Sequence, residues 1–518
     1  MSDLLATHRC PPGGSCFYRR ALAFCAMIAM AMVFRSEDLT DWDAWDYTAQ
    51  ALTAHSSDLL LGRWWFIATM RGVYLAARPI LGLQPTEGYL AMQAACTLMM
   101  ALAVVAGMAW TYRLTRSAAA EVLFAAMVIP GPSIAIYASA VMTESMTFLM
   151  ISLAMLLWEY AVANPNRAAF RALLAGFCFG VAVDIREPVI FLAAWPIVSC
   201  FIDRPPRRGR LLAVACGGAA LTLGIGILGA WAWYPWYRGY FANILAWARS
   251  MAEEREQFGL SIIRNLGFLG LYCLAAAPAA MLATIPGTIW SAFRRRRLCW
   301  LALSMVPFVV SLLLNHDLSI NPRHPLALAW MLLPVAAGAV SGWIVPMGRR
   351  YRLRLGVAVG LVLAVGGAAL AASWGTIEEY YFAYADSQHR IFRALLPLPR
   401  DAVIVAGPGT PVATYLNIIG EKDFNVVRSG WSWPGDDLRR LLEQELAAGK
   451  SLYVNLDKSD WTRSTRKSPE WDQLCSAVAG YVPRPSVWPM FEMRRPPTSA
   501  PAASRSASPS APAITSPR

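Results

Sequence analysis

Long apolar segments alternate with short polar segments along most of this chain. A helix that crosses a bilayer needs about 20 mostly apolar residues. About eleven segments come near this length, give or take one or two: 18–34, 89–112, 118–138, 141–163, 169–184, 188–203, 211–234, 266–292, 298–314, 325–345 and 355–374. The pattern predicts an α-helical polytopic membrane protein. The segments 169–184 and 188–203 are short, so they predict two spans, two half-spans or one broken hairpin.

After residue 374 the pattern changes to short strands that alternate with helices. We expect strands at 402–405, 424–427 and 451–454, with helices at 411–419 and 436–448 between them. Such alternation predicts a small α/β layer with parallel pairing. The loop Gly407-Pro408-Gly409 lacks the spacing of a dinucleotide fingerprint, so we interpret it as a turn before a helix.

These patterns divide the chain into three parts. Residues 1–374 form a transmembrane body, and residues 375–495 form a small soluble α/β domain. Residues 496–518 are rich in Pro, Ser and Ala, a composition typical of a disordered tail.

Composition and charge agree with a membrane protein. The chain is 57% hydrophobic and only 15% charged, whereas soluble domains carry about 25% charged residues. Arginines cluster in alternate loops, which the positive-inside rule places in the cytoplasm. The N-terminus is then inside, and the loop 35–88 and everything after 374 lie outside. The net charge of +13 is dispersed over loops, which argues against nucleic-acid binding.

The first outer loop contains further helical signals. Arg63, Arg71 and Arg78 fall within an arc of about 80° on a helix. We therefore expect one or two helices in the membrane interface within 47–82, with Trp64 and Trp65 as anchors at headgroup level. Residues 235–262 resemble this segment.

The same loop opens on three carboxylates, Asp41, Asp43 and Asp46, interleaved with Trp42 and Trp45. One interpretation is a solvated acidic loop that caps a helix, because acids favour helix starts. The other is a general base for a hydroxyl group, its pKa raised by a partly apolar site.

Further candidates lie at the predicted outer ends of later spans. Glu144 near the start of 141–163 is either functional, as ionisable groups at membrane depth usually are, or a helix-start residue above the interface. Arg186, in Asp184-Ile185-Arg186-Glu187, either pairs with its acidic neighbours or binds a phosphate. Arg323 is the stronger phosphate candidate. The nearby His316 and His324 lack a metal-like spacing.

Together these residues predict one outer-facing cavity. Carboxylates suit a hydroxyl nucleophile, and arginines suit an anionic leaving group. A sugar linked to a lipid phosphate meets both requirements, and its tail can stay in the bilayer.

With this layout and these residues, the chain resembles the GT-C superfamily of integral-membrane glycosyltransferases. Within that superfamily it is most similar to the protein O-mannosyltransferase and lipid A aminoarabinose transferase branch. The resemblance covers residues 18–345 by layout. The family carries an acidic motif in the first outer loop, followed by Tyr and a small residue, matched here by Asp43, Tyr47 and Ala51. The resemblance implies that Asp43 is the catalytic base, with Asp41 or Asp46 as the rival.

The resemblance extends to other positions. Glu144 matches a second family acid by position, and Arg186 matches an Arg after a short helix. Arg323-His324 matches an Arg-aromatic pair only in part, because His replaces the more usual Tyr. The resemblance also implies an integral protein of a bacterial inner membrane, with a cytoplasmic N-terminus and a periplasmic or extracellular C-terminal domain.

The implied reaction is an inverting transfer of a hexose or pentose. Asp43 would take the proton of a glycan, lipid or protein acceptor, and Glu144 would orient the acceptor or Asp43. Arg186 and Arg323, helped by Arg63 and Arg71, would hold the phosphate of a polyprenyl-phosphate-linked donor. No cofactor and no metal site are expected, with a divalent ion between Asp43 and Glu144 as the alternative.

Two other functions compete. A transporter or flippase also has charges in its spans and a broken helix, but it predicts polar groups facing inward as well as outward. The inner halves of the spans look almost purely apolar, which favours the enzyme. If the protein is a non-catalytic scaffold, Asp43→Asn should leave its function unchanged.

Overall fold

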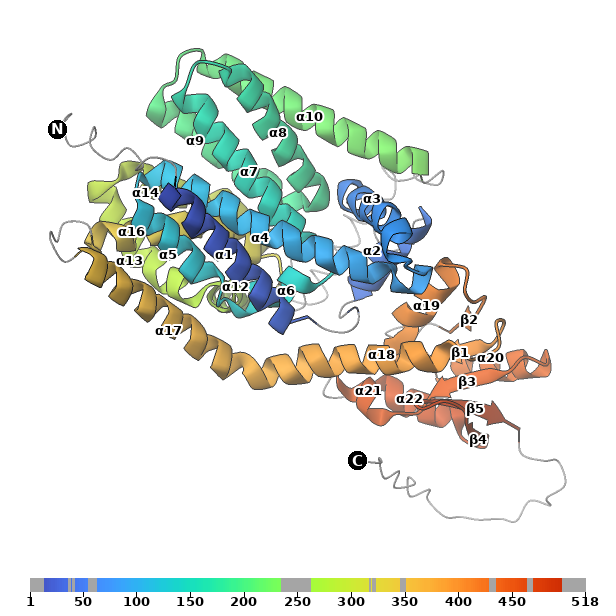
Figure 1. Cartoon of the computed structure of the whole chain (residues 1–518). Coiled ribbons are helices and arrows are strands. Elements are labelled where there is room, and N and C mark those ends of the chain that lie inside the picture. Colours follow the sequence, from blue (N-terminus) through green and yellow to red (C-terminus); the bar gives the residue numbers. More distant parts are fainter. Residues whose placement is uncertain are drawn as a thin grey trace. The chain divides into compact units, whose positions relative to one another are not determined.

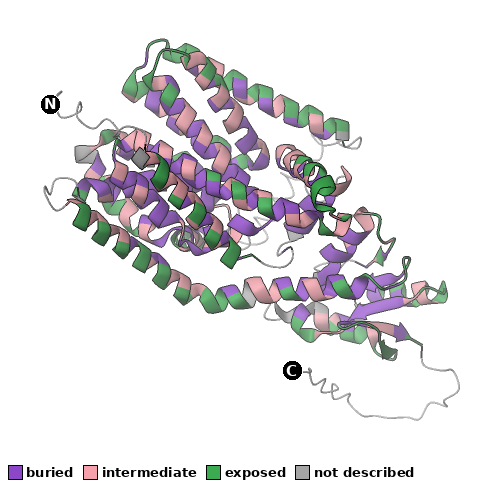
Figure 2. Cartoon of the chain, in the orientation of Figure 1, coloured by how far each residue is buried: buried purple, intermediate pink, exposed green. Residues whose placement is uncertain are grey.

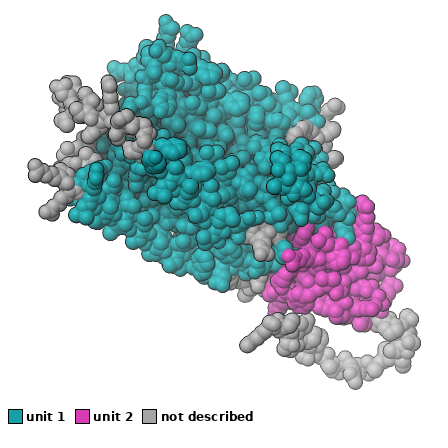
Figure 3. Space-filling view, viewed as in Figure 1, with its two compact units in different colours: residues 1–389, 415–422 teal, residues 390–414, 423–518 magenta. Residues whose placement is uncertain are grey.

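The computed structural model describes residues 14–35, 39, 42–54, 63–233, 262–315, 318, 323–344, 351–427, 435–463 and 469–495 (Figure 1). Asp41, nearly all of 235–262 and the tail 496–518 lie outside the described residues. The chain forms two compact units, 1–389 with 415–422 and 390–414 with 423–518 (Figure 3). The division therefore falls after His389 rather than after residue 374, which lies inside a continuous helix.

The first unit is helical throughout its described residues. In chain order it contains α1 (Gly14–Val33), α2 (Trp42–Thr53), α3 (Trp64–Leu81), η2 (Pro85–Glu87), α4 (Gly88–Thr115), α5 (Ala118–Val128), α6 (Pro132–Ser139), α7 (Thr143–Ala163), α8 (Ala168–Ile185), η3 (Glu187–Ala193), α9 (Ala194–Asp203), α10 (Arg208–Trp233), α12 (Ile262–Ala276), α13 (Pro278–Arg294), α14 (Arg296–Leu303), α15 (Val306–Asn315), α16 (Leu326–Ile344) and α17 (Tyr351–Ile377).

The predicted polytopic architecture is confirmed. Within the described residues, eight helices are long and apolar enough to cross a membrane, or up to ten when each of two bent pairs counts as one span. The alternatives left open for 169–184 and 188–203 resolve differently for the two segments. The first is α8, which is long and apolar enough to be a full span. The second folds as η3 followed by α9, whose ten residues extend only about 15 Å, so it has the length of a half-span.

The two bent pairs are α5 with α6, bent by 75°, and α12 with α13, bent by 115°. Pro130, Gly131 and Pro132 interrupt the first pair, and Pro278 starts the helix after the second break. A Cβ added to Gly131 would lie 1.9 Å from the carbonyl oxygen of Ala276. The first break therefore contacts the second, and only glycine permits that approach.

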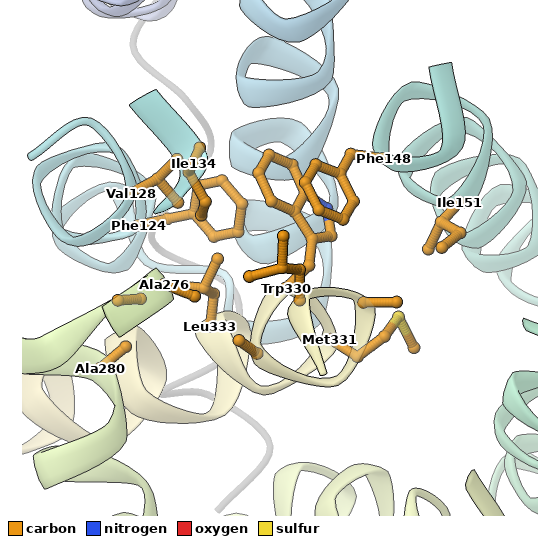
Figure 4. Packing of buried hydrophobic residues seen from close by; sticks show 14 of the residues in the cluster. Phe124, Val128, Ile134, Phe148, Ile151, Ala276, Ala280, Trp330, Met331 and Leu333 are labelled. Carbon is orange, nitrogen blue, oxygen red and sulfur yellow. The ribbon is translucent and has the colours of Figure 1, made fainter. Parts of the chain in front are cut away.

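The interior of the bundle is built on stacked aromatic rings. Trp330 of α16 lies parallel to Phe148 at 4.6 Å between ring centroids, and Phe124 meets it edge-on at 5.6 Å (Figure 4). The buried indole donates from Nε1 to Ser152 Oγ at 2.9 Å, so its one polar atom is satisfied. The helices α10 and α17 at the periphery of the bundle are mostly exposed, as lipid-facing spans should be (Figure 2).

Glycines let α8 and α10 approach closely, as small residues do in membrane helix pairs. A Cβ on Gly218 would lie 2.3 Å from the backbone oxygen of Leu173, whereas one on the adjacent Gly217 would meet nothing within 4 Å. We expect Gly218→Val to destabilise the protein by about 1–3 kcal/mol through overpacking, and Gly217→Val to leave it near wild type. Unfolding in a titration with SDS measures both, and equal losses would contradict this packing.

Two carboxylates are buried at the ends of the bundle that we predict to be inner. Glu121 accepts from Arg19 at 3.1 Å and from Arg20 at 2.5 Å. Glu159 accepts from Arg297 at 2.5 Å. The expectation of almost purely apolar inner halves is wrong at these positions. The buried acids are tolerated there because arginines at the same ends of the helices neutralise them.

The second unit contains one five-stranded sheet in the order β2-β1-β3-β5-β4. Its strands are β1 (Val403–Val405), β2 (Asn425–Val426), β3 (Leu452–Asn455), β4 (Val482–Pro485) and β5 (Met490–Arg494). The helices α19 (Thr410–Ile418) and α20 (Gly435–Ala447) connect the first three strands, which pair in parallel as predicted. β5 and β4 add an antiparallel edge that the prediction lacked.

Candidate active site

Asp43 lies in the first turn of α2 and faces two arginines from distant parts of the chain. Its Oδ2 accepts a hydrogen bond from Nη2 of Arg323 and lies 3.7 Å from Nη1 of Arg63. The side chains are only 15–17% exposed, so little water screens these charges. Asp43 therefore lies between two guanidinium groups.

Arg63 precedes α3 and is mostly buried against an aromatic ring. Its guanidinium carbon lies 5.4 Å from the ring centroid of Tyr47. Arg63 Nε and Nη1 and the Tyr47 hydroxyl are buried, and none of the three has a hydrogen-bond partner among the described residues. Burial lowers the pKa of Arg63, whereas the carboxylates of Glu187 and Asp43 raise it. Donors for a further anion are thus available beside Asp43.

Arg186 links Arg323, which pairs with Asp43, to the carboxylate of Glu144. Its Nη2 donates to Glu144 Oε1 at 2.5 Å, and its Nη1 donates to the carbonyl oxygen of Arg323 at 2.8 Å. Arg186 and Glu144 are 3% and 0% exposed, and no described residue donates a hydrogen bond to Glu144 Oε2. Arg186 thus pairs with an acid on α7 rather than with its sequence neighbours.

These five residues form one connected group, which we call the Asp43 cluster: Asp43, Arg63, Glu144, Arg186 and Arg323. They lie near the starts of α2, α3 and α7, at the end of α8 and before α16. Three guanidinium groups and two carboxylates leave a net charge of +1 when all are ionised. The cluster can hold an anion and can offer a carboxylate to a proton in the same place.

No protein-family model matches the chain, and no curated protein matches it significantly. The structure of ArnT from Cupriavidus metallidurans bound to undecaprenyl phosphate superposes with a TM-score of 0.53 at 12% identity, over 92% of this chain and 97% of that one. The apo structure of the same protein superposes with a TM-score of 0.51, at the same identity and coverage. The chain has the GT-C fold. The fold class predicted from the layout of 18–345 is confirmed over most of the chain.

Within the GT-C fold, the three carboxylates predicted to lie in the first outer loop have different surroundings. Asp43 belongs to the cluster. Asp46 is 7% exposed, and its Oδ2 accepts from Gln50 Nε2 at 2.7 Å on the same helix. Asp41 lies outside the described residues.

Arg71 is not brought to the Asp43 cluster. Its Nη1 donates to the carbonyl oxygens of Ala51 at 3.1 Å and Leu52 at 3.0 Å, in the last turn of α2. Ala51 follows Asp43 by eight residues, which is about 12 Å along a helix. The structure therefore places Arg71 as a cap on the far end of α2, against the expectation that it binds the donor phosphate.

We expect Arg71→Met to destabilise the protein by about 1–3 kcal/mol, because two carbonyl oxygens lose a charged donor. Arg78→Met is the matched control, since Arg78 is an exposed arginine on the same helix. Affinity for polyprenyl phosphate should change little in either variant. Unfolding curves and lipid titrations on both proteins measure these effects, and a selective loss of phosphate affinity in Arg71→Met would contradict the capping role.

Trp64 and Trp65, expected as interface anchors, pack inside the GT-C fold. Trp65 donates from Nε1 to the carbonyl oxygen of Thr222 at 3.1 Å, and its ring meets Phe177 at 5.6 Å. Trp64 lies close to Gly229, where a Cβ would come within 2.3 Å of its ring. Both side chains therefore dock α3 onto α8 and α10.

Among the described residues, no three His, Cys, Asp or Glu side chains are grouped as a metal site requires. The carboxylates of Asp43 and Glu144 are each paired with arginine. A divalent ion between them would have to displace these guanidinium groups.

Proposed function

We propose that the protein is a membrane glycosyltransferase that moves a sugar from a polyprenyl-phosphate-linked donor to a lipid, glycan or protein acceptor. The observation that carries this proposal is the Asp43 cluster, a carboxylate flanked by guanidinium groups within the GT-C fold. ArnT, which shares the fold, has been crystallised with undecaprenyl phosphate. We place the reaction on the outer face of the membrane, because the positive-inside rule puts the arginine-rich loops on the cytoplasmic side. We take the membrane to be a bacterial inner membrane.

In this proposal Asp43 is the general base. It takes the proton from an acceptor hydroxyl or amine, whose lone pair attacks the anomeric carbon from the face opposite the phosphate. The bond from that carbon to the phosphate oxygen breaks, and its electron pair stays on the phosphate. The sugar configuration is inverted in one displacement.

The guanidinium groups suit the leaving group. A sugar phosphodiester carries one negative charge, and the polyprenyl phosphate that departs gains a second. Arg63, Arg186 and Arg323 therefore interact more strongly with the transition state than with the bound donor, which is the condition for catalysis.

The pairing of Asp43 with arginine also supports an ordered reaction. A donor phosphate that competes for Arg63 and Arg323 would loosen the pairs that both arginines make with Asp43. The carboxylate of Asp43 would then be free to accept the proton of the acceptor only after the donor is bound.

A lipid flippase is the second candidate, because Glu121 and Glu159 place charges at the opposite ends of the spans. Mass spectrometry of lipids that co-purify with wild type and with Asp43→Asn tests the proposal. We expect a polyprenyl-phosphate sugar enriched in the variant, and its mass would identify the sugar. Bulk phospholipid alone in both proteins would count against a donor of this class.

A further inference from the structure

The first turn of α3 is capped by a residue from another helix. Arg63 occupies the position before α3 with a φ of 64°, and its guanidinium can only donate, so it cannot cap the helix. Asp184, at the end of α8, supplies the missing acceptors. Its Oδ2 accepts from the backbone N–H of Trp65 at 3.1 Å, and its carbonyl oxygen accepts from the N–H of Arg63 at 3.2 Å. A carboxylate at a helix start also interacts favourably with the helix dipole.

This anchor determines where the Arg63 guanidinium lies. Within the described part of the chain, Arg63 Nε and Nη1 make no hydrogen bond, so the backbone, stacking on Tyr47 and the ion pair with Asp43 hold the group. Its distance of 3.7 Å to Asp43 Oδ2 therefore depends on the position of the first turn of α3. A shift of that turn would move the guanidinium relative to Asp43.

Helix α10 packs against Asp184 at Gly226. A Cβ on Gly226 would lie 2.7 Å from Asp184 Oδ1 and 3.3 Å from Trp65 Cδ1, so alanine there would press mainly on the carboxylate. Gly224 on the same helix has nothing within 4 Å of such a Cβ. The two glycines provide a way to displace the carboxylate without removing it.

We propose that Asp184 is a positioning residue that aligns Arg63 for the donor phosphate; this rests on the proposed function, in which Arg63 binds that phosphate. Two residues further on, Arg186 donates to the carbonyl oxygen of Arg323. The segment 184–186 thus holds both arginines that flank Asp43, Arg63 through Asp184 and Arg323 through Arg186.

The test compares the affinities of the full-length protein in nanodiscs for undecaprenyl phosphate and for the neutral undecaprenol. Wild type should prefer the phosphate. Asp184→Ala should weaken phosphate binding about tenfold and leave undecaprenol binding unchanged, as should Arg63→Ala. Because the two residues act through one group, the double variant should lose no more than either single variant. Asp184→Asn keeps an acceptor for Trp65 N–H and should stay within about threefold of wild type.

Gly226→Ala, with Gly224→Ala as its control, gives a second route that applies even if Asp184→Ala does not fold. Gly226→Ala should weaken phosphate binding selectively, and Gly224→Ala should not. No preference for the phosphate in wild type would overturn the proposed function itself. A wild-type preference that Asp184→Ala and Gly226→Ala leave intact, or an equal loss of both ligands, would overturn only the role of Asp184.

Discussion

Asp43→Asn is expected to lower sugar transfer by about 10³-fold, because a positioned general base contributes about 10²–10⁴-fold. The amide keeps the shape of the side chain and can still accept from Arg323, so the variant should fold. Donor binding should be retained, since loss of the carboxylate leaves Arg63 and Arg323 free to hold the phosphate. Transfer by the purified protein with the donor identified by mass spectrometry is the measurement.

Asp46→Asn is the matched control for this prediction. It lies three residues further along α2 and is also buried, and an amide still accepts from Gln50. We expect activity near wild type. Full activity in Asp43→Asn with loss in Asp46→Asn would assign the base to Asp46, and activity in both would remove the carboxylates of α2 from the reaction.

Arg186→Ala is expected to destabilise the protein by about 3–5 kcal/mol, the usual cost of leaving one member of a buried ion pair without its partner. Glu144 is the partner left behind, and it is fully buried. The variant should also raise KM for the donor more than for the acceptor, because Arg186 is proposed to act on the phosphate.

A double variant separates the two effects. Arg186→Met with Glu144→Met replaces both charges by apolar side chains and should recover most of the lost stability. Donor use should stay impaired in the double variant. Recovery of donor use along with stability would show that Arg186 has only a structural role, and equal effects on donor and acceptor would contradict its contact with phosphate.

The fold could be predicted from the sequence because the signals for its helices and strands are local and repeated. Apolar runs of span length predict helices wherever they occur. The parallel strands β1 and β3 are short, mostly apolar runs that are buried along their whole length. β4 escaped prediction because Val482–Pro485 is fully exposed and contains two prolines, so it lacks alternation. The segment 188–203 was left open between a span and a half-span because apolarity alone does not reveal the break between η3 and α9.

The candidate site was predicted less completely, since its pairings join distant segments. Topology alone placed Asp43, Glu144, Arg186 and Arg323 at one face, and the structure connects them. The pairing between these residues could not be predicted. For example, Asp184 and Glu187 are next to Arg186 in sequence, yet Arg186 pairs with Glu144, which lies 42 residues away. Arg63 and Arg71 were both expected to hold the donor phosphate, but one flanks Asp43 and the other caps the far end of α2. Asp184 was missed as a cap because it lies 119 residues from Trp65.

The most direct test of the account is to follow the donor lipid in proteoliposomes that contain the purified protein and an acceptor. We expect wild type to consume the lipid-linked sugar and to release an equal amount of free polyprenyl phosphate, while Asp43→Asn releases it about 10³-fold more slowly. Movement of the intact lipid-linked sugar to the other leaflet, with no polyprenyl phosphate released by wild type, would contradict it and establish a flippase.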